Sequence, residues 1–233
     1  MLSNLAKKAL EVYGGENLWK NSKSVEAIVS VKGLLFTIKR RPLFKEAKVT
    51  VDIHRIYSKI TPIGKDPDIS GVFENDRVYL QNANEEIIAE RKKPRNYFPY
   101  GRRLFSWDDL DMAYFANYAF WNYFTFPNLL MNENIVWTEN GNKLEALFPD
   151  NFPTHSKRQL FIFDPETSRL LQHNYTAEVV SGLATAANVV KEHKTENGIL
   201  YPSRRVITPQ SKKRGYLQRP VIVDDEVHSL RMY

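Results

Sequence analysis

Apolar residues recur at two different spacings along this chain, and the spacing changes from segment to segment. Near the amino terminus they lie three and four positions apart, which is the period of a helix with one buried face. These residues are Leu2, Leu5, Ala6, Ala9, Leu10 and Tyr13. Gly14 and Gly15 follow at once, and glycine is common just beyond a helix end. The pattern therefore predicts an amphipathic helix over residues 2–13, with a short continuation over 16–20.

Beyond residue 23 the period becomes two, as in a strand with one buried face. Val25, Ala27, Val29 and Val31 alternate with residues that form a more polar face. The further segments read as strands are 35–39, 46–60, 70–80, 134–138, 143–148, 158–163, 170–180, 188–195, 199–208 and 220–230. Residues typical of tight turns separate many of them. Strands this short and this closely joined are expected to pair antiparallel.

A helix is predicted over residues 108–124, between the two runs of strands. Asp108, Asp109 and Asp111 lie in its first turn, where the helix dipole favours negative charge. We interpret them as helix-start charges rather than as a metal or acid–base cluster. Pro127 is expected to interrupt or end the helix, and residues 94–107 before it are expected to form a loop.

This central helix is unusually aromatic, with Tyr114, Phe115, Tyr118, Phe120, Trp121, Tyr123, Phe124 and Phe126. Aromatic residues on every side leave no solvent face, so the helix is either buried all round or borders a ligand space. A packed core and a pocket wall both fit this pattern. If it is a pocket wall, the candidate ligand-binding residues are Trp107, Tyr114, Phe115, Tyr118, Trp121, Asn122 and Phe124.

The order of elements predicts a mainly β fold of the α+β class. We expect a single curved antiparallel sheet, an open half-barrel, wrapped around the central aromatic-rich helix, with a second helix at the amino terminus. Pro and Gly occur singly rather than in a flexible stretch, and no internal repeat is visible. The expected organisation is therefore one domain over residues 1–233.

Composition removes several classes of function. Cysteine is absent, which excludes disulfides, thiolate nucleophiles and Cys-based zinc sites. No glycine loop for phosphate is present, so no cofactor is expected, and the histidine spacings predict no metal site. The formal net charge is +6, but the basic residues are scattered over expected strand ends and turns. Nucleic-acid binding is therefore not expected, whereas weak association with an anionic membrane surface stays open.

Location and assembly are less constrained. No export signal is visible at the start of the sequence, which favours a soluble cytoplasmic protein; a removed signal would instead mean a periplasmic or extracytoplasmic one. The longest apolar region, residues 112–131, is interrupted by polar residues and is not expected to span a membrane. The oligomeric state stays open.

A small set of side chains could carry acid–base chemistry. The candidates are His155, His173, Tyr175, Glu178 and His193. In an extended strand His173 and Tyr175 share one face, so these two can act together. If a buried Glu178 faced His193 across the sheet, the carboxylate would raise the pKa of the imidazole and make it a general acid or base. A structural role is the competing interpretation for each of the five.

Short stretches of the sequence resemble a known superfamily. They are Tyr13-Gly14-Gly15, the hairpin over residues 161–167, Trp107 to Asp111, Tyr114-Phe115, Trp121 to Tyr123, Thr154 to Ser156, Tyr175 to Glu178 and Ala186-Ala187. In its element order and in the first two of these stretches the chain resembles the LolA/LolB-like periplasmic lipoprotein carriers. In the other stretches it most closely resembles an uncharacterised bacterial group of similar length. The resemblance implies an open β-barrel that holds lipid acyl chains under helices.

Three functions are consistent with these observations. The first is a binding protein for a hydrophobic or amphiphilic small molecule or lipid, held in a cavity between the concave sheet and the central helix. The second is a cofactor-independent enzyme that acts on an aromatic or polyene-like substrate in the same cavity by acid–base catalysis. The third is association with anionic membrane or nucleic acid through the basic turns. A cavity lined almost wholly by apolar groups would favour the first.

Overall fold

The computed structural model describes residues 2–211, 213 and 215–233. In this part of the chain one antiparallel sheet of 14 strands dominates the fold. Its first six strands are β1 (Ser24–Lys32), β2 (Phe44–Asp52), β3 (Tyr57–Thr61), β4 (Ser70–Glu74), β5 (Arg77–Gln81) and β6 (Ile87–Lys92). The others are β7 (Val136–Asn140), β8 (Lys143–Leu147), β9 (Arg158–Phe163), β10 (Leu170–Thr176), β11 (Thr185–Glu196), β12 (Ile199–Ser211), β13 (Gly215–Tyr216) and β14 (Val223–Met232).

Four α-helices accompany this sheet among the described residues. They are α1 (Asn4–Val12), α2 (Gly15–Asn21), α3 (Leu34–Lys39) and α4 (Asp109–Leu129). Two short 3-10 helices, Pro94–Tyr97 and Gly101–Leu104, precede α4 in the segment that was expected to be a loop. The predicted mainly β α+β fold with a central helix is confirmed.

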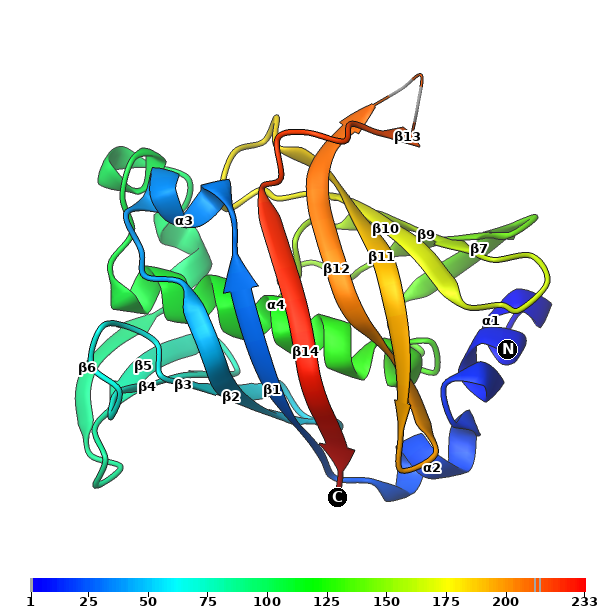
Figure 1. Cartoon of the computed structure of the whole chain (residues 1–233), viewed down its shortest axis with the longest axis horizontal. Helices are drawn as coiled ribbons and strands as arrows, with labels where there is room; N and C mark the ends of the chain where they lie inside the picture. Colours follow the sequence, from blue (N-terminus) through cyan, green and yellow to red (C-terminus); the bar gives the residue numbers. More distant parts are fainter. Residues whose placement is uncertain (1, 212, 214) are drawn as a thin grey trace.

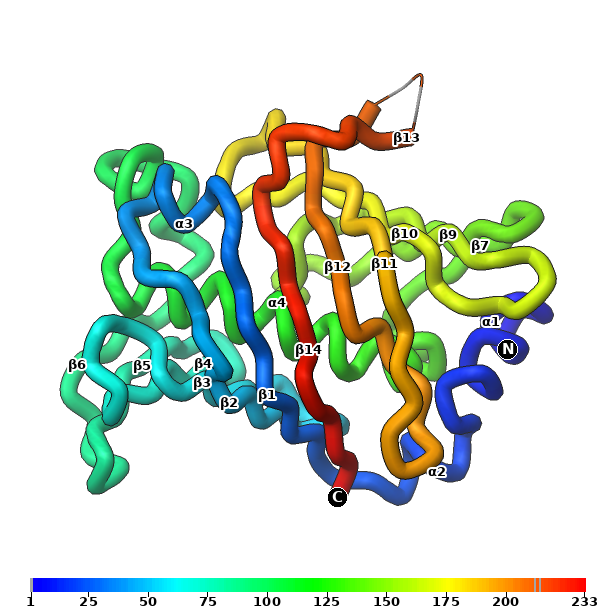
Figure 2. The backbone as a smooth tube through the Cα atoms, in the orientation of Figure 1, coloured from blue at the N-terminus to red at the C-terminus, as the bar shows by residue number. Residues whose placement is uncertain are grey.

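The carboxyl-terminal strand joins the two runs of strands into one sheet. The strand order is β6-β5-β4-β3-β2-β1-β14-β12-β11-β10-β9-β8-β7, and β13 pairs with β12 off this path. Figure 2 shows β14 lying between β1 and β12, which are far apart in sequence. Within the described residues β6 and β7 end the order without pairing with each other. The sheet is therefore open, as the sequence predicted.

The central helix crosses the concave side of this sheet. Figure 1 shows α4 running across β1, β14 and β12 rather than along them. The sheet curves around the helix (Figure 1), and its two ends, β6 and β7, are connected in sequence through the segment that contains α4. The core consequently lies between α4 and the inward side chains of the strands, such as Val29, Val49 and Val227, each of which is almost completely buried.

Several predicted boundaries are corrected by the structure. Residues 35–39 form α3 rather than a strand, because Gly33 breaks β1 with a φ of 135° and a short apolar run does not distinguish helix from strand. The predicted strand 46–60 is two strands, β2 and β3. The strand predicted over 170–180 ends at Thr176, and β6 was not foreseen. The central helix continues five residues past Phe124, since Pro127 lies in its last turn.

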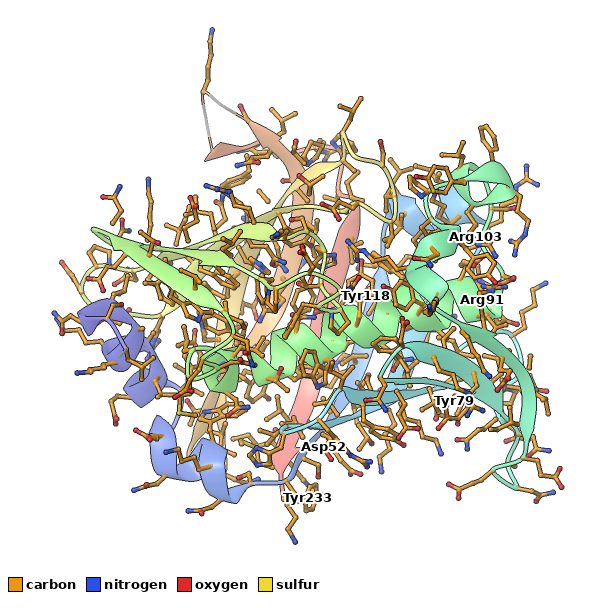
Figure 3. All side chains as sticks on the ribbon, turned by 180° about the vertical axis from the view of Figure 1, so that it is seen from behind. Asp52, Tyr79, Arg91, Arg103, Tyr118 and Tyr233 are labelled. Atoms are coloured by element: carbon orange, nitrogen blue, oxygen red, sulfur yellow. The ribbon has the colours of Figure 1, made fainter. Side chains whose placement is uncertain are left out.

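The start of α4 is fixed by charge, as the sequence indicated. Asp108 caps the helix, and Asp108 and Asp111 accept from each other's backbone nitrogens in a reciprocal capping box. The buried Asp111 carboxylate also pairs with Arg91 and Arg103, both at 2.6 Å. Figure 3 shows these two arginines beside the first turns of the helix. Their charges hold α4 in place at one end.

Along one side α4 packs directly on the sheet. Asn117 donates to the Gly71 carbonyl at 3.0 Å and accepts from the Ser58 hydroxyl at 2.7 Å. A Cβ atom added at Gly71 would lie 2.7 Å from the Ala113 Cβ and 2.9 Å from the Ile63 Cγ1. The helix therefore approaches β4 so closely that only glycine fits at this position.

We expect Gly71→Ala to lower the free energy of unfolding by about 1–3 kcal/mol, the usual cost of overpacking a tight contact. Gly182→Ala is the matched control, because a Cβ at Gly182 would meet nothing within 4 Å. Chemical denaturation of the two variants gives the comparison. Equal stability of both variants would show that α4 does not press against β4.

Candidate functional site

On its other side α4 stands away from the sheet and leaves a cavity of about 350 Å³. Six helix residues line it at a spacing of three, one, three, one and three positions, which is one face of a helix. They are Met112, Phe115, Ala116, Ala119, Phe120 and Tyr123. The two alanines lie in the middle of this face, where their small side chains leave room beside the helix.

The opposite walls come from α3 and from strands on both sides of β14. These lining residues are Val31, Leu35, Phe36, Ile38, Phe44, His155, Tyr175, Ala177, Val180, Leu183, Ala184, Thr185, Ala186, Ile207, Thr208, Pro209, Ile222, Val223 and Asp225. Most of these side chains are apolar. Such a lining, with few polar groups, is typical of sites for small hydrophobic molecules, whose volumes start at roughly 300 Å³.

The cavity meets solvent between α3 and the segment that connects β10 to β11. Ile38 and Leu183 both line the cavity, yet they are 48% and 90% exposed. By contrast His155 and Asp225, which also line it, are 1% and 3% exposed. The site therefore runs from an apolar entrance to a buried region that carries polar groups.

A chain of hydrogen bonds in the wall centres on His155. Its Nδ1 lies 3.1 Å from the Tyr118 hydroxyl and its Nε2 lies 3.0 Å from the Tyr123 hydroxyl. The Tyr123 and Tyr175 hydroxyls are 2.9 Å apart, and the Tyr175 ring stacks on the imidazole with 3.8 Å between centroids. Both imidazole nitrogens are occupied, so this cluster holds its members in fixed orientations.

Burial keeps the side chains of this hydrogen-bonded cluster uncharged. Burial lowers the pKa of His155 to about 3, and the nearby Arg95 guanidinium acts in the same direction. Burial likewise raises the pKa of Tyr123 to about 12. Near neutral pH the imidazole and the phenols are therefore neutral. They can exchange protons along hydrogen bonds, but a charge on any of them is costly.

The other predicted acid–base residues do not belong to this hydrogen-bonded cluster. His173 shares a face with Tyr175, as predicted, with 4.9 Å between ring centroids. Its Nε2 bonds the Gln159 side chain at 2.5 Å, outside the cavity lining. His193 lies 3.0 Å from the Tyr13 hydroxyl, and burial lowers its pKa to about 4.

Glu178 and His193 are not brought together. Glu178 follows β10 and pairs with Arg95 at 2.5 Å. The β10–β11 register runs from Thr176 opposite Thr185 to Gln172 opposite Val189. Glu178 therefore lies beyond one end of this pairing and His193 beyond the other, so the conditional Glu178–His193 pair does not form.

Of the aromatic helix residues predicted to bind a ligand, Phe115 lies on the cavity wall. The others make contacts elsewhere. Tyr118 bonds His155, and Trp121 donates to the Asp52 and Arg55 carbonyls at 2.9 and 3.1 Å. Trp107 packs on Phe98 and Phe115, and Tyr114 packs on Phe73 and Phe98. Asn122 donates to the Tyr118 and Pro153 carbonyls. Phe124 stacks on Phe120.

The residues that sequence reasoning missed are mainly small or distant in sequence. Ala116 and Ala119 were passed over in favour of the large aromatic residues beside them. Their spacing from Met112 and Tyr123 was nevertheless visible as a single helix face. Asp225 carried no signal of its own, because its place on the wall depends on β14 entering the centre of the sheet.

Two further features bear on what the site can hold. Within the described residues no group of three or more His, Asp or Glu side chains is arranged to bind a metal ion. No helix in that part of the chain is long and apolar enough to cross a membrane. The lining of the cavity is an apolar surface with a few buried hydrogen-bonding groups.

Comparison with known proteins gives similarity of structure alone. No protein-family model matches the sequence, and no curated protein matches it. The structure is similar to a LolA superfamily protein from Nitrosomonas europaea at 11% identity, covering 98% of this chain and 92% of that one, with a TM-score of 0.49. It is also similar to a DUF1329 family protein from Desulfovibrio piger, at 11% identity over 98% and 91% of the two chains and a TM-score of 0.49.

Proposed function

We propose that this protein binds a hydrophobic or amphiphilic small molecule or lipid in the cavity between α4 and the concave sheet. The observation that carries the proposal is the lining: a space of about 350 Å³ bordered almost entirely by apolar side chains and opening at two exposed ones. Burying an apolar molecule there removes its surface from water, which contributes roughly 25 cal/mol per Å². The entrance between Ile38 and Leu183 gives such a molecule a route inward.

The enzyme hypothesis has one observation in its favour, which is the hydrogen-bonded chain of His155, Tyr123 and Tyr175 in the same wall. These hydrogen-bonded side chains make a weak acid–base catalyst, because the lowered pKa of His155 makes its imidazole a weak base. Its three rings also form part of the packed wall. Binding without chemistry is the simpler use of this arrangement.

A substitution that fills the cavity tests the proposal. Ala119→Phe adds a ring in the middle of the helix face that borders the space. We expect it to weaken binding of the neutral apolar dye Nile red by at least about tenfold, because the ring occupies the volume that the dye needs, and tenfold corresponds to about 1.4 kcal/mol. Fluorescence titration gives the affinities.

Ala83→Phe is the matched control, because it adds the same ring at an exposed turn between β5 and β6. This variant should bind the dye like the original protein. The proposal fails if Ala119→Phe also retains the original affinity while its melting temperature and spectrum show a folded protein. Native mass spectrometry of the purified protein, followed by solvent extraction, then identifies any molecule that it carries.

A further inference from the structure

A carboxylate lies where an apolar cavity would be expected to have an apolar side chain. Asp225 on β14 is paired with Val31 on β1 and with Arg205 on β12, so its side chain belongs to the inward row of the sheet. It lines the cavity and is 3% exposed. Taking a carboxyl group out of water is costly unless it is hydrogen-bonded.

This carboxyl group is incompletely satisfied by the protein. The Oδ1 atom of Asp225 is buried without a hydrogen-bond partner in the described structure. The same is true of the Thr208 hydroxyl, which also lines the cavity. Buried polar atoms in folded proteins are almost always hydrogen-bonded, so these two atoms mark a place where a bound molecule can supply the partner. Both atoms belong to residues that border the space where a ligand would lie.

The neighbouring arginine does not supply that partner. Arg205 is 4% exposed, and its guanidinium carbon lies 4.9 Å from the centroid of the Tyr123 ring. Its Nη1 atom is buried without a partner in the described structure, as is the Asp225 Oδ1 atom, so these two atoms do not bond each other. A cation stacked on Tyr123 and a carboxyl group therefore stand near each other with open hydrogen-bonding positions.

We propose that the cavity selects a molecule with an apolar body and a neutral hydroxyl group, and that Asp225 is the hydrogen-bonding partner of this hydroxyl. The inference rests on the proposed function of the cavity. A charged head group of either sign would be attracted by one of Asp225 and Arg205 and repelled by the other, and it would lose its hydration in the apolar cavity without a net gain. A hydroxyl both donates and accepts, so it can satisfy Asp225 and Thr208 together.

The protonation of Asp225 suits such a partner. Burial raises its pKa to about 7; Arg205 opposes this shift, whereas Asp224 and Glu226 add to it. Near neutral pH the carboxyl group is therefore present in both forms. The ionised form accepts a hydrogen bond from a hydroxyl, and the protonated form donates one to it.

Four ligands with the same ten-carbon tail test the inference: decanol, decyl methyl ether, decylamine and decanoate. Their affinities are measured by displacement of Nile red from the full chain at pH 9, where the Asp225 carboxyl group is mostly ionised and accepts hydrogen bonds without donating them. We expect decanol to bind about tenfold more tightly than the ether, which lacks the donor, and more tightly than either charged ligand. In Asp225→Leu the alcohol should lose about tenfold in affinity, whereas the ether should change by less than about twofold.

Asp225→Asn is the conservative variant, since its amide keeps a donor and an acceptor without a charge. Its carbonyl accepts from the alcohol and its NH2 group can donate to the ether, so the variant should bind decanol about as tightly as the original protein and lose part of the preference over the ether. It keeps the test open if Asp225→Leu fails to fold. The inference is overturned if decanol and the ether bind equally tightly, or if the amine or decanoate binds more tightly than decanol. It is also overturned if Asp225→Leu lowers the affinities for the alcohol and for the ether by the same factor. If no ligand displaces the dye and Ala119→Phe has no effect, the proposed function fails instead.

Discussion

Replacement of Trp121 by alanine is expected to lower the free energy of unfolding by about 3–5 kcal/mol, as for other buried Phe or Trp residues. Trp121 is 4% exposed and packs against Phe152 on the side of α4 that does not border the cavity. Its Nε1 atom also donates to the carbonyls of Asp52 and Arg55, which would lose their donor. In Figure 3 Asp52, the last residue of β2, lies below α4.

The same variant should keep the affinity of the original protein for Nile red under conditions where it remains folded. Ala119→Phe is the reciprocal variant, since it should lose binding and keep its stability. Urea denaturation gives the free energy of unfolding of each variant, and dye titration gives its affinity for Nile red. A Trp121→Ala protein with unchanged stability and no dye binding would place Trp121 in the ligand site and contradict this assignment.

Asp225→Asn is expected to stabilise the protein at pH 8 by up to about 4 kcal/mol and to have little effect at pH 4. Burial raises the pKa of Asp225 from 3.8 to about 7. A group whose pKa is raised on folding stabilises fully below its unfolded value, and this contribution is lost as pH rises through the folded value. At about 1.4 kcal/mol per unit, a shift of about three units gives the stated limit.

The expected pH dependence takes account of the charged and titratable groups around Asp225. Arg205 faces it from β12 and Tyr123 from α4, while Asp224 and Glu226 adjoin it on β14. On the β1 side its partner is Val31, which does not titrate. The measurement is urea denaturation of both proteins from pH 4 to pH 8.

Asp224→Asn is the matched control for this series. Asp224 pairs with Arg204 at 3.2 Å, and removing such a partly exposed pair should cost at most about 1 kcal/mol. This change has the opposite sign to the one expected for Asp225→Asn. The same stability difference for Asp225→Asn at pH 4 and pH 8 would mean that this carboxyl group keeps its ordinary pKa in the folded protein.

Much of the fold was accessible from the sequence because it depends on local periodicity. The alternation through Val25, Ala27 and Val29 gave β1, and the acidic residues before the aromatic run gave the start of α4. Local pattern failed for α3, because six residues after a glycine are too few to separate a period of two from one of 3.6. Nothing local could show that β14 lies between β1 and β12.

The candidate site was harder to predict than the fold. The aromatic residues of the helix fitted a packed core and a pocket wall alike, and Phe115, His155 and Tyr175 do lie on the wall of the cavity. A cavity, however, forms where side chains are small, and on the helix side of this one the small residues are Ala116 and Ala119. The polar Asp225 became visible only once the pairing of distant strands was known.

The most direct test of the central claim is to locate a ligand in the cavity. Crystals of the protein soaked with a long-chain alcohol that carries bromine at the far end of its tail can be measured at the bromine absorption edge. We expect one dominant anomalous peak inside the cavity that Ala119 of α4 and Ile207 of β12 border, and none there in Ala119→Phe crystals. A dominant bromine peak at any other place, with the space beside Ala119 free of ligand density, would contradict the claim.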